Sequence, residues 1–319
     1  MSDPATAAPW RTWLQLLRAP NLFTVPGDPL AGFLLATGGV LDHRLPLAIG
    51  ASLCFYSHGL LLNDLADLAE DRRDRPSRPL PSGAARTRTV LIAAIVLALL
   101  ALALCYGISQ DTLYAGVVLL AAIVLYNLWA KKNPILGPIN MGLCRGLSIF
   151  IGAAAGLNEF ANADGRPSAA TWSTLLALAV FAATGATLYI AAVTHLARLE
   201  TDVDPPKLPR TFPFVTLVFV IVSFFLSAID RTQPLRYTNI WLYLIGAYTV
   251  YAGYRIHQRL TRQPAPPIPP IIGQLIRLLL PLQAIFCLAS RSLAGNVSAA
   301  ALLILWPISK SVSRRFYAS

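Results

Sequence analysis

A run of acidic residues that passes into a run of arginines is the part of this chain best suited to chemistry. It covers residues 63–83 and follows a strongly apolar stretch. If the segment stays helical, the turn of about 100° per residue places one amide and four carboxylates within an arc of roughly 100°: Asn63, Asp64, Asp67, Asp71 and Asp74. Like charges at this spacing repel each other, so a cation should hold them together.

Mg²⁺ suits this cluster well. It prefers hard oxygen ligands, and it takes one or two protein carboxylates while leaving its other positions to water and substrate phosphate. The arginines that follow, including Arg72 and Arg78, could then bind phosphate oxygens. The sequence therefore predicts a site for Mg²⁺ and a diphosphate. The alternative is a solvated charged loop whose arginines neutralise its acids.

The composition indicates a membrane protein. Of 319 residues, 55% are hydrophobic and 13% are charged, and the mean hydropathy is +0.58. Stretches of about 20 apolar residues can cross the hydrocarbon core of a bilayer. They lie near 12–39, 46–66, 87–107, 112–130, 135–157, 170–198, 211–230, 238–259 and 271–290. We therefore expect an all-α polytopic membrane protein in which residues 1–319 form a single domain with nine transmembrane helices.

Two of the apolar stretches are irregular. The first contains Pro20, Pro26 and Pro29, so we expect a broken or bent helix. Residues 297–309 are short for a crossing and carry Pro307, so they form either a tenth span or an interfacial helix. The first 20 residues show no short apolar core followed by a small-residue cleavage site, so we expect no cleaved signal peptide.

Lys and Arg are divided unevenly between the two sides of the expected bundle. Sixteen lie at the N-terminus or in the loops after spans two, four, six and eight, against five in the opposite loops. The positive-inside rule then places the acidic cluster on the cytoplasmic side of a cell (inner) membrane. The net charge of +11 is spread over membrane-flanking loops, which indicates contact with anionic lipid rather than with nucleic acid.

A second polar cluster closes the sixth expected span on the same side. Its members are Tyr189, Thr194, His195, Arg198, Glu200, Asp202 and Asp204. Helical spacing from His195 places Asp202 near the same face, while Glu200 points away, so Asp202 is the better partner for a metal. The cluster could equally consist of a structural histidine and ordinary interfacial charges.

The fifth expected span carries Arg145 inside the membrane. An ionisable residue in a span is costly, so Arg145 is a functional candidate that should face the bundle interior. A snorkelling or carbonyl-bonded structural arginine is the alternative. Asn21 and Tyr126 are also polar residues within expected spans and are weaker functional candidates, since each could instead cap or brace helices.

These residues resemble the UbiA-type intramembrane prenyltransferases. The pattern Asn63-Asp64-x-x-Asp67-x-x-x-Asp71, followed by Arg78-Pro79-Leu80-Pro81-Ser82-Gly83, is similar to the first signature of that family. Residues 18–22 resemble the family's opening and residues 133–146 its fifth helix, so the resemblance spans most of the chain. It implies nine helices around a central cavity, and two acidic motifs that bind Mg²⁺ and a prenyl diphosphate.

By this resemblance, Asn63, Asp67 and Asp71 are metal ligands of the first motif, with Asp64 as support. The second motif departs from the pattern. It is similar to an Asp-x-x-x-Asp motif of the menaquinone branch in which Arg198 replaces the first aspartate and Asp202 remains. Arg198 could contact the diphosphate directly. The sequence of residues 194–200 is more similar to the EboC-like branch of the superfamily.

The expected reaction is the Mg²⁺-assisted ionisation of a prenyl diphosphate and capture of the prenyl group by an aromatic or other lipophilic acceptor. The catalytic candidates are Asp67, Asp71, Asp202 and Arg145, and the substrate-binding candidates are Arg72, Arg78, Arg198, Asn21, Tyr126, Tyr189 and His195. A transporter and a member that binds a prenyl lipid without turnover stay open as alternatives. A CDP-alcohol phosphotransferase would carry a signature that begins Asp-Gly-x-x-Ala-Arg, and the sequence lacks this motif.

Overall fold

The chain is helical throughout the part that can be described. A computed structural model describes residues 9–162, 169–199, 207–228, 237–262 and 267–316, and within these ranges the regular elements are helices. They are α1 (Pro9–Leu16), α2 (Ala19–Leu22), α3 (Gly27–Thr37), α4 (Arg44–Ala66), α5 (Leu68–Asp74), α6 (Thr87–Ile108), α7 (Gln110–Leu128), the 3₁₀ helix η2 (Ala130–Lys132), α8 (Leu136–Asn162), α9 (Ala169–Ala197), α10 (Lys207–Ala228), α11 (Tyr237–Leu260), α12 (Ile268–Arg277), α13 (Leu279–Leu288) and α14 (Leu293–Phe316).

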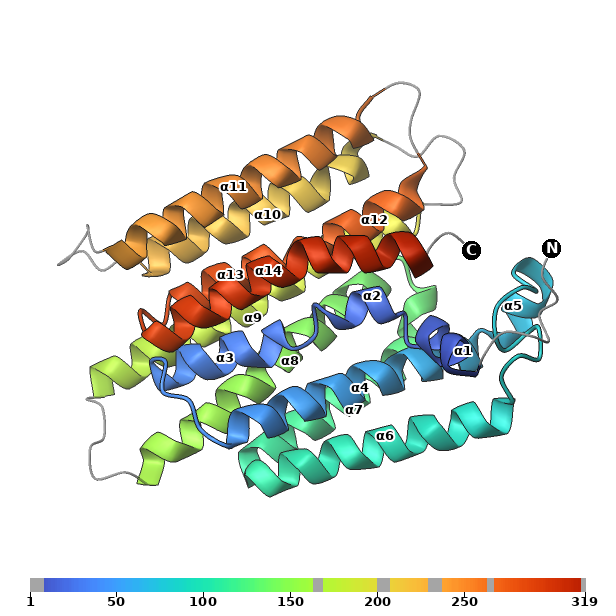
Figure 1. Cartoon of the computed structure of the whole chain (residues 1–319), viewed down its shortest axis with the longest axis horizontal. Coiled ribbons are helices and arrows are strands. Elements are labelled where there is room, and N and C mark those ends of the chain that lie inside the picture. The colour runs from blue at the N-terminus through green and yellow to red at the C-terminus, as the bar shows by residue number, and fades with distance from the viewer. Residues whose placement is uncertain (1–8, 163–168, 200–206, 229–236, 263–266, 317–319) are drawn as a thin grey trace.

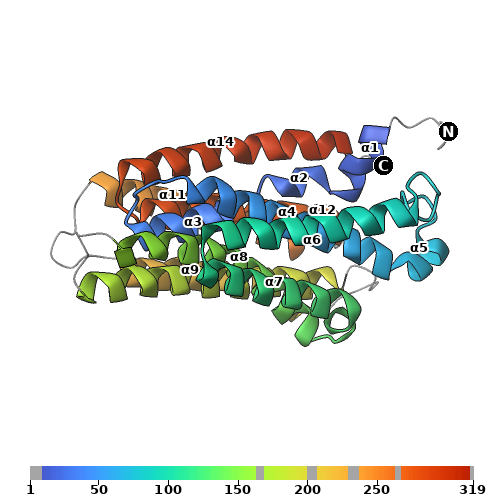
Figure 2. The ribbon, with the colours of Figure 1, turned by 90° about the horizontal axis from the view of Figure 1, so that it is seen from below.

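The long helices lie side by side in one bundle. Figure 1 shows them running along the longest axis of the molecule, with α5 at one end and the α10–α11 pair on one side. Figure 2 shows the same helices from below, and they are aligned in this view as well. Such an aligned bundle of apolar helices suits a bilayer, because each helix satisfies its own backbone hydrogen bonds.

Eight helical stretches of the described chain are long and apolar enough to cross a membrane: Arg44–Ala66, Thr87–Ile108, Gln110–Leu128, Leu136–Leu157, Ser173–Ala197, Pro209–Ala228, Ile268–Leu288 and Leu293–Ser313. The protein is therefore a multi-pass membrane protein. The expected count of nine is not confirmed. Two of the nine expected spans are not among the eight: the first, 12–39, and the span 238–259, which the tyrosine-rich α11 covers.

The first expected span is broken, as predicted. α2 ends at Leu22 and α3 begins at Gly27. Pro20 and Pro29 each lie in the first turn of a helix, where the missing N–H of proline leaves no hydrogen bond unmade. At the other terminus, the apolar piece 297–309 is part of the 24-residue helix α14, one of the eight stretches able to cross.

Glycines allow α3 and α8 to pack in close contact. A Cβ atom on Gly32 of α3 would lie 1.9 Å from the carbonyl oxygen of Ile149, and one on Gly152 of α8 would lie 1.9 Å from that of Pro29. Small residues at membrane helix interfaces permit this close backbone approach. The contact fixes the start of α3 against α8, the helix that carries Arg145.

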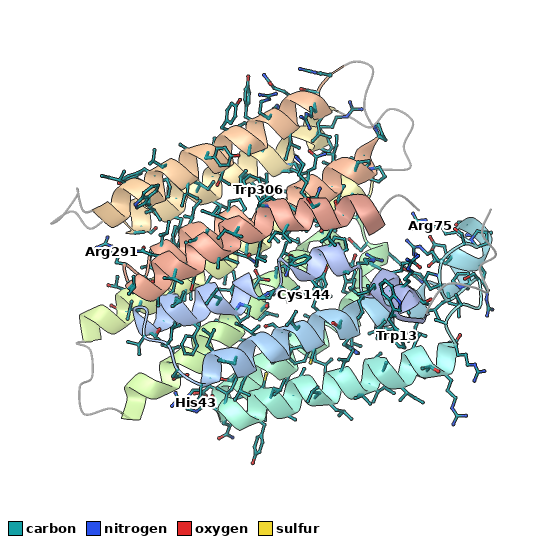
Figure 3. The ribbon with its side chains drawn as sticks, in the orientation of Figure 1. Trp13, His43, Arg75, Cys144, Arg291 and Trp306 are labelled. Carbon is teal, nitrogen blue, oxygen red and sulfur yellow. The ribbon has the colours of Figure 1, made fainter. Side chains whose placement is uncertain are left out.

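The buried helix α13 closes the interior of the bundle. All of its residues, Leu279–Leu288, are buried, and it packs against α3, α11 and α14. Figure 3 shows Arg75 at the end of the bundle where α5 lies and His43 and Arg291 at the opposite end. The two ends thus separate the loops that the charge pattern assigns to opposite sides of the membrane.

Candidate active site

An apolar cavity of about 370 Å³ lies inside the bundle. This volume is in the range of small-molecule sites. Phe55, Leu119, Ile123, Ile190 and Val193 contribute to its apolar walls. Its polar lining residues are Arg18, Asn21, Ser52, Tyr56, Asn63, Tyr126, Asn127, Arg145, Ser148 and Thr194.

The cavity extends from the acidic segment into the bundle. On α4 its lining runs from Asn63 back to Ser52, a distance of about 16 Å at 1.5 Å per residue. We call the Asn63 end the mouth and the Ser52 end the inner end. At the inner end, Ser148 of α8 donates a hydrogen bond to Ser52 at 3.1 Å. Figure 3 places the lining residue Cys144 in the middle of the bundle.

The acidic segment bends at Asp67 without losing its helical register. α4 ends at Ala66 and α5 begins at Leu68. The N–H of Asp67 nevertheless donates to the carbonyl oxygen of Asn63 at 2.9 Å, and the N–H of Asp71 donates to that of Asp67 at 2.8 Å. The face predicted from helical spacing is therefore present from Asn63 to Asp71.

Basic side chains from other parts of the chain neutralise this face. Arg78 Nη1 donates to both carboxylate oxygens of Asp71, at 3.0 and 2.7 Å, and Asp71 is buried. Arg18 Nη2 lies 3.6 Å from Asp64 Oδ1. Since Arg18 and Asn63 both line the cavity, this ion pair joins the acidic face to the mouth.

A third pair was not singled out from the sequence. Lys131 of η2 forms an ion pair with Asp67 through its Nζ atom. The available signal was that Lys131 follows the fourth expected span on the side of the acidic segment. Arg198 donates to the carbonyl oxygens of residues 131–133 in the same turn, with Nη1 3.2 Å from that of Asn133. Arg198 thus supports the turn that carries Lys131.

The donor set of this face fits Mg²⁺. Within the described ranges, no group of three or more His, Cys, Asp or Glu side chains is close enough together to hold a metal ion. Mg²⁺ does not need such a group, because it takes one or two carboxylates and completes its shell with water and phosphate oxygens. The neighbouring carboxylates of Asp67 and Asp71 supply oxygens of that kind. Asp202, the ligand expected from the second motif, lies outside the described residues.

The remaining expected residues are divided between the cavity and other places. Asn21 and Tyr126 line the cavity. Arg72 of α5 is exposed. The buried Tyr189 donates its hydroxyl to the carbonyl oxygen of Leu275 at 2.7 Å, and His195 lies beside Phe212 with ring centroids 5.8 Å apart. Neither Tyr189 nor His195 lines the cavity.

Asp74 does not join the paired acids, although helical spacing predicted it on the same face, and its side chain is exposed on α5. Arg73 Nε donates to its carboxylate at 3.0 Å. The Arg73 guanidinium holds the pKa of this carboxyl below its ordinary value. Asp74 therefore belongs to a surface ion pair at the end of the bundle.

Arg145 faces the bundle interior, as predicted. Its Nη1 donates to Asp28 Oδ2 at 2.7 Å, and its Nη2 donates to the hydroxyl of Thr24. Gln283 Nε2 donates to Asp28 Oδ1 at 2.6 Å and to the carbonyl oxygen of Thr24 at 2.8 Å. Asp28 is fully buried. Sequence reasoning missed Asp28, although an acid within the first expected span was a signal.

An all-helical membrane bundle with paired acids and bases at the mouth of an apolar cavity defines the class of protein. The UbiA prenyltransferase family matches residues 29–270, which is more than half of the chain. The chain belongs to this family, which confirms the resemblance drawn from its motifs. The EboC-like branch stays a prediction.

Several relatives are archaeal digeranylgeranylglyceryl phosphate synthases. The protein from Methanoregula boonei is 30% identical over 195 residues, which cover 60% of this chain and 60% of that protein. The protein from Methanoculleus marisnigri is 28% identical over 153 residues, which cover 46% of this chain and 52% of that protein. The matched stretch spans about half the length of the latter relative.

Solved structures share the fold. A UbiA homologue from Aeropyrum pernix K1 superposes with a TM-score of 0.61 at 16% identity, covering 83% of this chain and 96% of the other. A UbiA homologue from Archaeoglobus fulgidus bound to GPP and Mg²⁺ superposes with a TM-score of 0.56 at 18% identity, covering 91% and 99%. At these identities the likeness establishes the fold.

Proposed function

We propose that this protein is an intramembrane prenyltransferase that moves a prenyl group from a prenyl diphosphate to a lipophilic acceptor. The observation that carries the proposal is that the Asp67–Lys131 and Asp71–Arg78 pairs lie on the helical segment that continues from Asn63, a residue that lines the mouth of an apolar cavity. A prenyl diphosphate has a polyanionic head and an apolar tail. It would match this arrangement with its head at the charged mouth and its tail along the apolar walls.

The basic residues at the mouth would bind the diphosphate head. Lys131 carries three N–H donors and Arg78 carries five, and the structure uses only some of them for the acids. Charge-assisted hydrogen bonds from these groups to phosphate oxygens are among the strong ones in proteins. Arg18 and Arg72 are further candidates, because Arg18 lines the cavity and Arg72 lies on α5 beside Asp71.

Asp67 and Asp71 would hold Mg²⁺ at the mouth, with Asn63 and Asp202 as further expected ligands. The metal ion would supply neutralisation of charge on the diphosphate. Lys131 and Arg78 would hold the leaving diphosphate oxygen while the bond between that oxygen and the prenyl carbon breaks. Walls such as Phe55 and Ile123 would keep water from the allylic cation until the acceptor forms the new bond and loses its proton.

The relatives enlarge the range of acceptors. The sequence resemblance implied an aromatic acceptor, whereas the relatives are named for digeranylgeranylglyceryl phosphate, a lipid of the glycerol phosphate type. The broader class that includes both is a lipophilic molecule with a nucleophilic hydroxyl or ring carbon. We place the mouth, and with it diphosphate release, on the cytoplasmic side because of the Lys and Arg distribution.

The test is Mg²⁺-dependent pyrophosphate release by the purified protein in lipid nanodiscs. Geranyl, farnesyl and geranylgeranyl diphosphate are supplied separately, with a cell lipid extract as acceptor. We expect release with at least one donor, loss of release in EDTA, and loss in Asp71→Asn. The matched control is Glu70→Gln, which changes the adjacent but exposed acid and should keep release. Tight donor binding without release would contradict the proposal and favour a non-catalytic prenyl-lipid binding protein or a transporter.

A further inference from the structure

We infer that the acceptor presents an uncharged polar group, such as an alcohol or phenol hydroxyl, toward the inner end of the cavity while its reacting atom faces the mouth, because Asp28 neutralises the Arg145 guanidinium that lines the cavity there. The inference rests on the proposed function, since it names the acceptor class of the same site. It depends on the contacts of Arg145, Asp28, Thr24 and Gln283, which join α3, α8 and α13.

Arg145 is placed to meet an acceptor. It lines the cavity together with Ser148, one turn further along α8, and Ser148 is hydrogen-bonded to Ser52 at the inner end. The charged side chains among the described lining residues are Arg18 and Arg145. Arg18 pairs with Asp64 at the mouth, so Arg145 is the cation that lies toward the inner end.

The positive charge of Arg145 is already balanced. Asp28 has no exposed surface, and both of its carboxylate oxygens accept hydrogen bonds, one from Arg145 and one from Gln283. The Cζ atom of Arg145 lies over the Tyr56 ring, 5.3 Å from its centroid, which adds a cation–π contact. The pair carries no net charge, although N–H groups of Arg145 without an assigned acceptor can still donate toward the cavity.

A charged acceptor group would therefore meet an unfavourable environment. A carboxylate or phosphate at the inner end would lose its hydration and would compete with Asp28 for the same guanidinium. An uncharged hydroxyl would lose far less hydration, and it could bond to Arg145, Ser52 or Ser148. We expect the difference to appear as a preference of about tenfold or more for the uncharged group.

The experiment compares related acceptors with and without a charged group. One pair is 4-hydroxybenzoate and its methyl ester, and the other is an alkylglyceryl phosphate and the matched alkylglycerol. Affinities are measured calorimetrically on the full-length protein in phosphatidylcholine nanodiscs, with geranylgeranyl thiolodiphosphate as an unreactive donor. The wild type should bind the uncharged member of each pair about tenfold more tightly. Equal binding, tighter binding of the charged member, or no binding of the uncharged member overturns the inference.

Variants separate the charge of Asp28 from its shape. Asp28→Asn leaves Arg145 unbalanced and should shift the preference toward the charged acceptor by about tenfold. The double variant Asp28→Asn/Arg145→Gln is again neutral and should keep the wild-type preference, so a preference for charged acceptors in this variant overturns the inference even if Asp28→Asn alone does not fold. Asp111→Asn, at an exposed acid of α7, is the matched control. An unchanged preference in a folded Asp28→Asn protein overturns the inference.

Failure of the inference and failure of the proposed function give different results. Pyrophosphate release that depends on Asp71, combined with tighter binding of charged acceptors, supports the proposed prenyltransferase activity and contradicts the inference of an uncharged acceptor group. Tighter binding of uncharged acceptors without pyrophosphate release supports the inference of an uncharged acceptor group and contradicts the proposed prenyltransferase activity.

Discussion

Lys131 forms an ion pair with Asp67 and thereby joins the connection between α7 and α8 to the acidic segment at the end of α4. The carbonyl oxygen of the same lysine accepts a hydrogen bond from Arg198. Arg198 stands where the sequence resemblance expects an acid. In this fold it supports a base of the candidate site through the backbone, so its presence is compatible with a working enzyme.

Replacing Lys131 by methionine should lower pyrophosphate release by about 100-fold, because one charge-assisted donor to the leaving diphosphate is removed. The affinity for the donor should also fall, which calorimetry with an unreactive thiolodiphosphate measures. The matched control is Lys132→Met, since Lys132 is exposed and adjacent. Unchanged release and donor affinity in Lys131→Met would show that Lys131 takes no part in diphosphate binding.

Replacing Arg198 by alanine should reduce activity through Lys131, because the turn at residues 131–133 loses its donor. The double variant Arg198→Ala/Lys131→Met should then be no worse than Lys131→Met alone, since both changes act on one contact. Additive losses would instead favour direct contact of Arg198 with the diphosphate. Increased Mg²⁺-dependent release in Arg198→Asp would mean that an acid at this position restores a metal ligand.

Tyr189→Phe should affect stability rather than substrate binding. The hydroxyl of Tyr189 donates to the carbonyl oxygen of Leu275 inside the bundle, and its loss should cost about 1 kcal/mol. A lower melting temperature in detergent with an unchanged donor affinity is the expected result. Tyr106→Phe, at an exposed tyrosine, is the control. A weaker donor affinity at unchanged stability would support the substrate contact predicted from the sequence.

The acidic face illustrates what local sequence can predict. Asn63, Asp67 and Asp71 share a face because the helical hydrogen bonds continue through the bend at Asp67. Spacing was not sufficient for Asp74, which is exposed and pairs with Arg73. The break in the first span was equally local, since it follows from the fixed backbone of proline. Both features depend on residues that are close together in the chain.

Contacts between distant segments were not predictable in the same way. The Asp28–Arg145 pair joins residues 117 positions apart, and the Lys131–Asp67 pair joins residues 64 apart. Each depends on which helices pack together, and helical periodicity carries no information on that. The position of Tyr189 shows the same limit, because its partner Leu275 lies 86 residues away.

The close contact of α3 with α8 should be essential for the Asp28–Arg145 pair. Gly152→Ala places a Cβ atom 1.9 Å from the carbonyl oxygen of Pro29, next to Asp28, so the helices must separate. We expect a loss of about 1–3 kcal/mol in stability, typical of overpacking, and a weaker preference for uncharged acceptors. Gly107→Ala, where an added Cβ meets no atom within 4 Å, should change neither the melting temperature nor the preference. An unchanged melting temperature in Gly152→Ala would show that α3 and α8 can separate without loss of stability. An unchanged acceptor preference would show that the charge balance at Arg145 does not depend on the close contact of these helices.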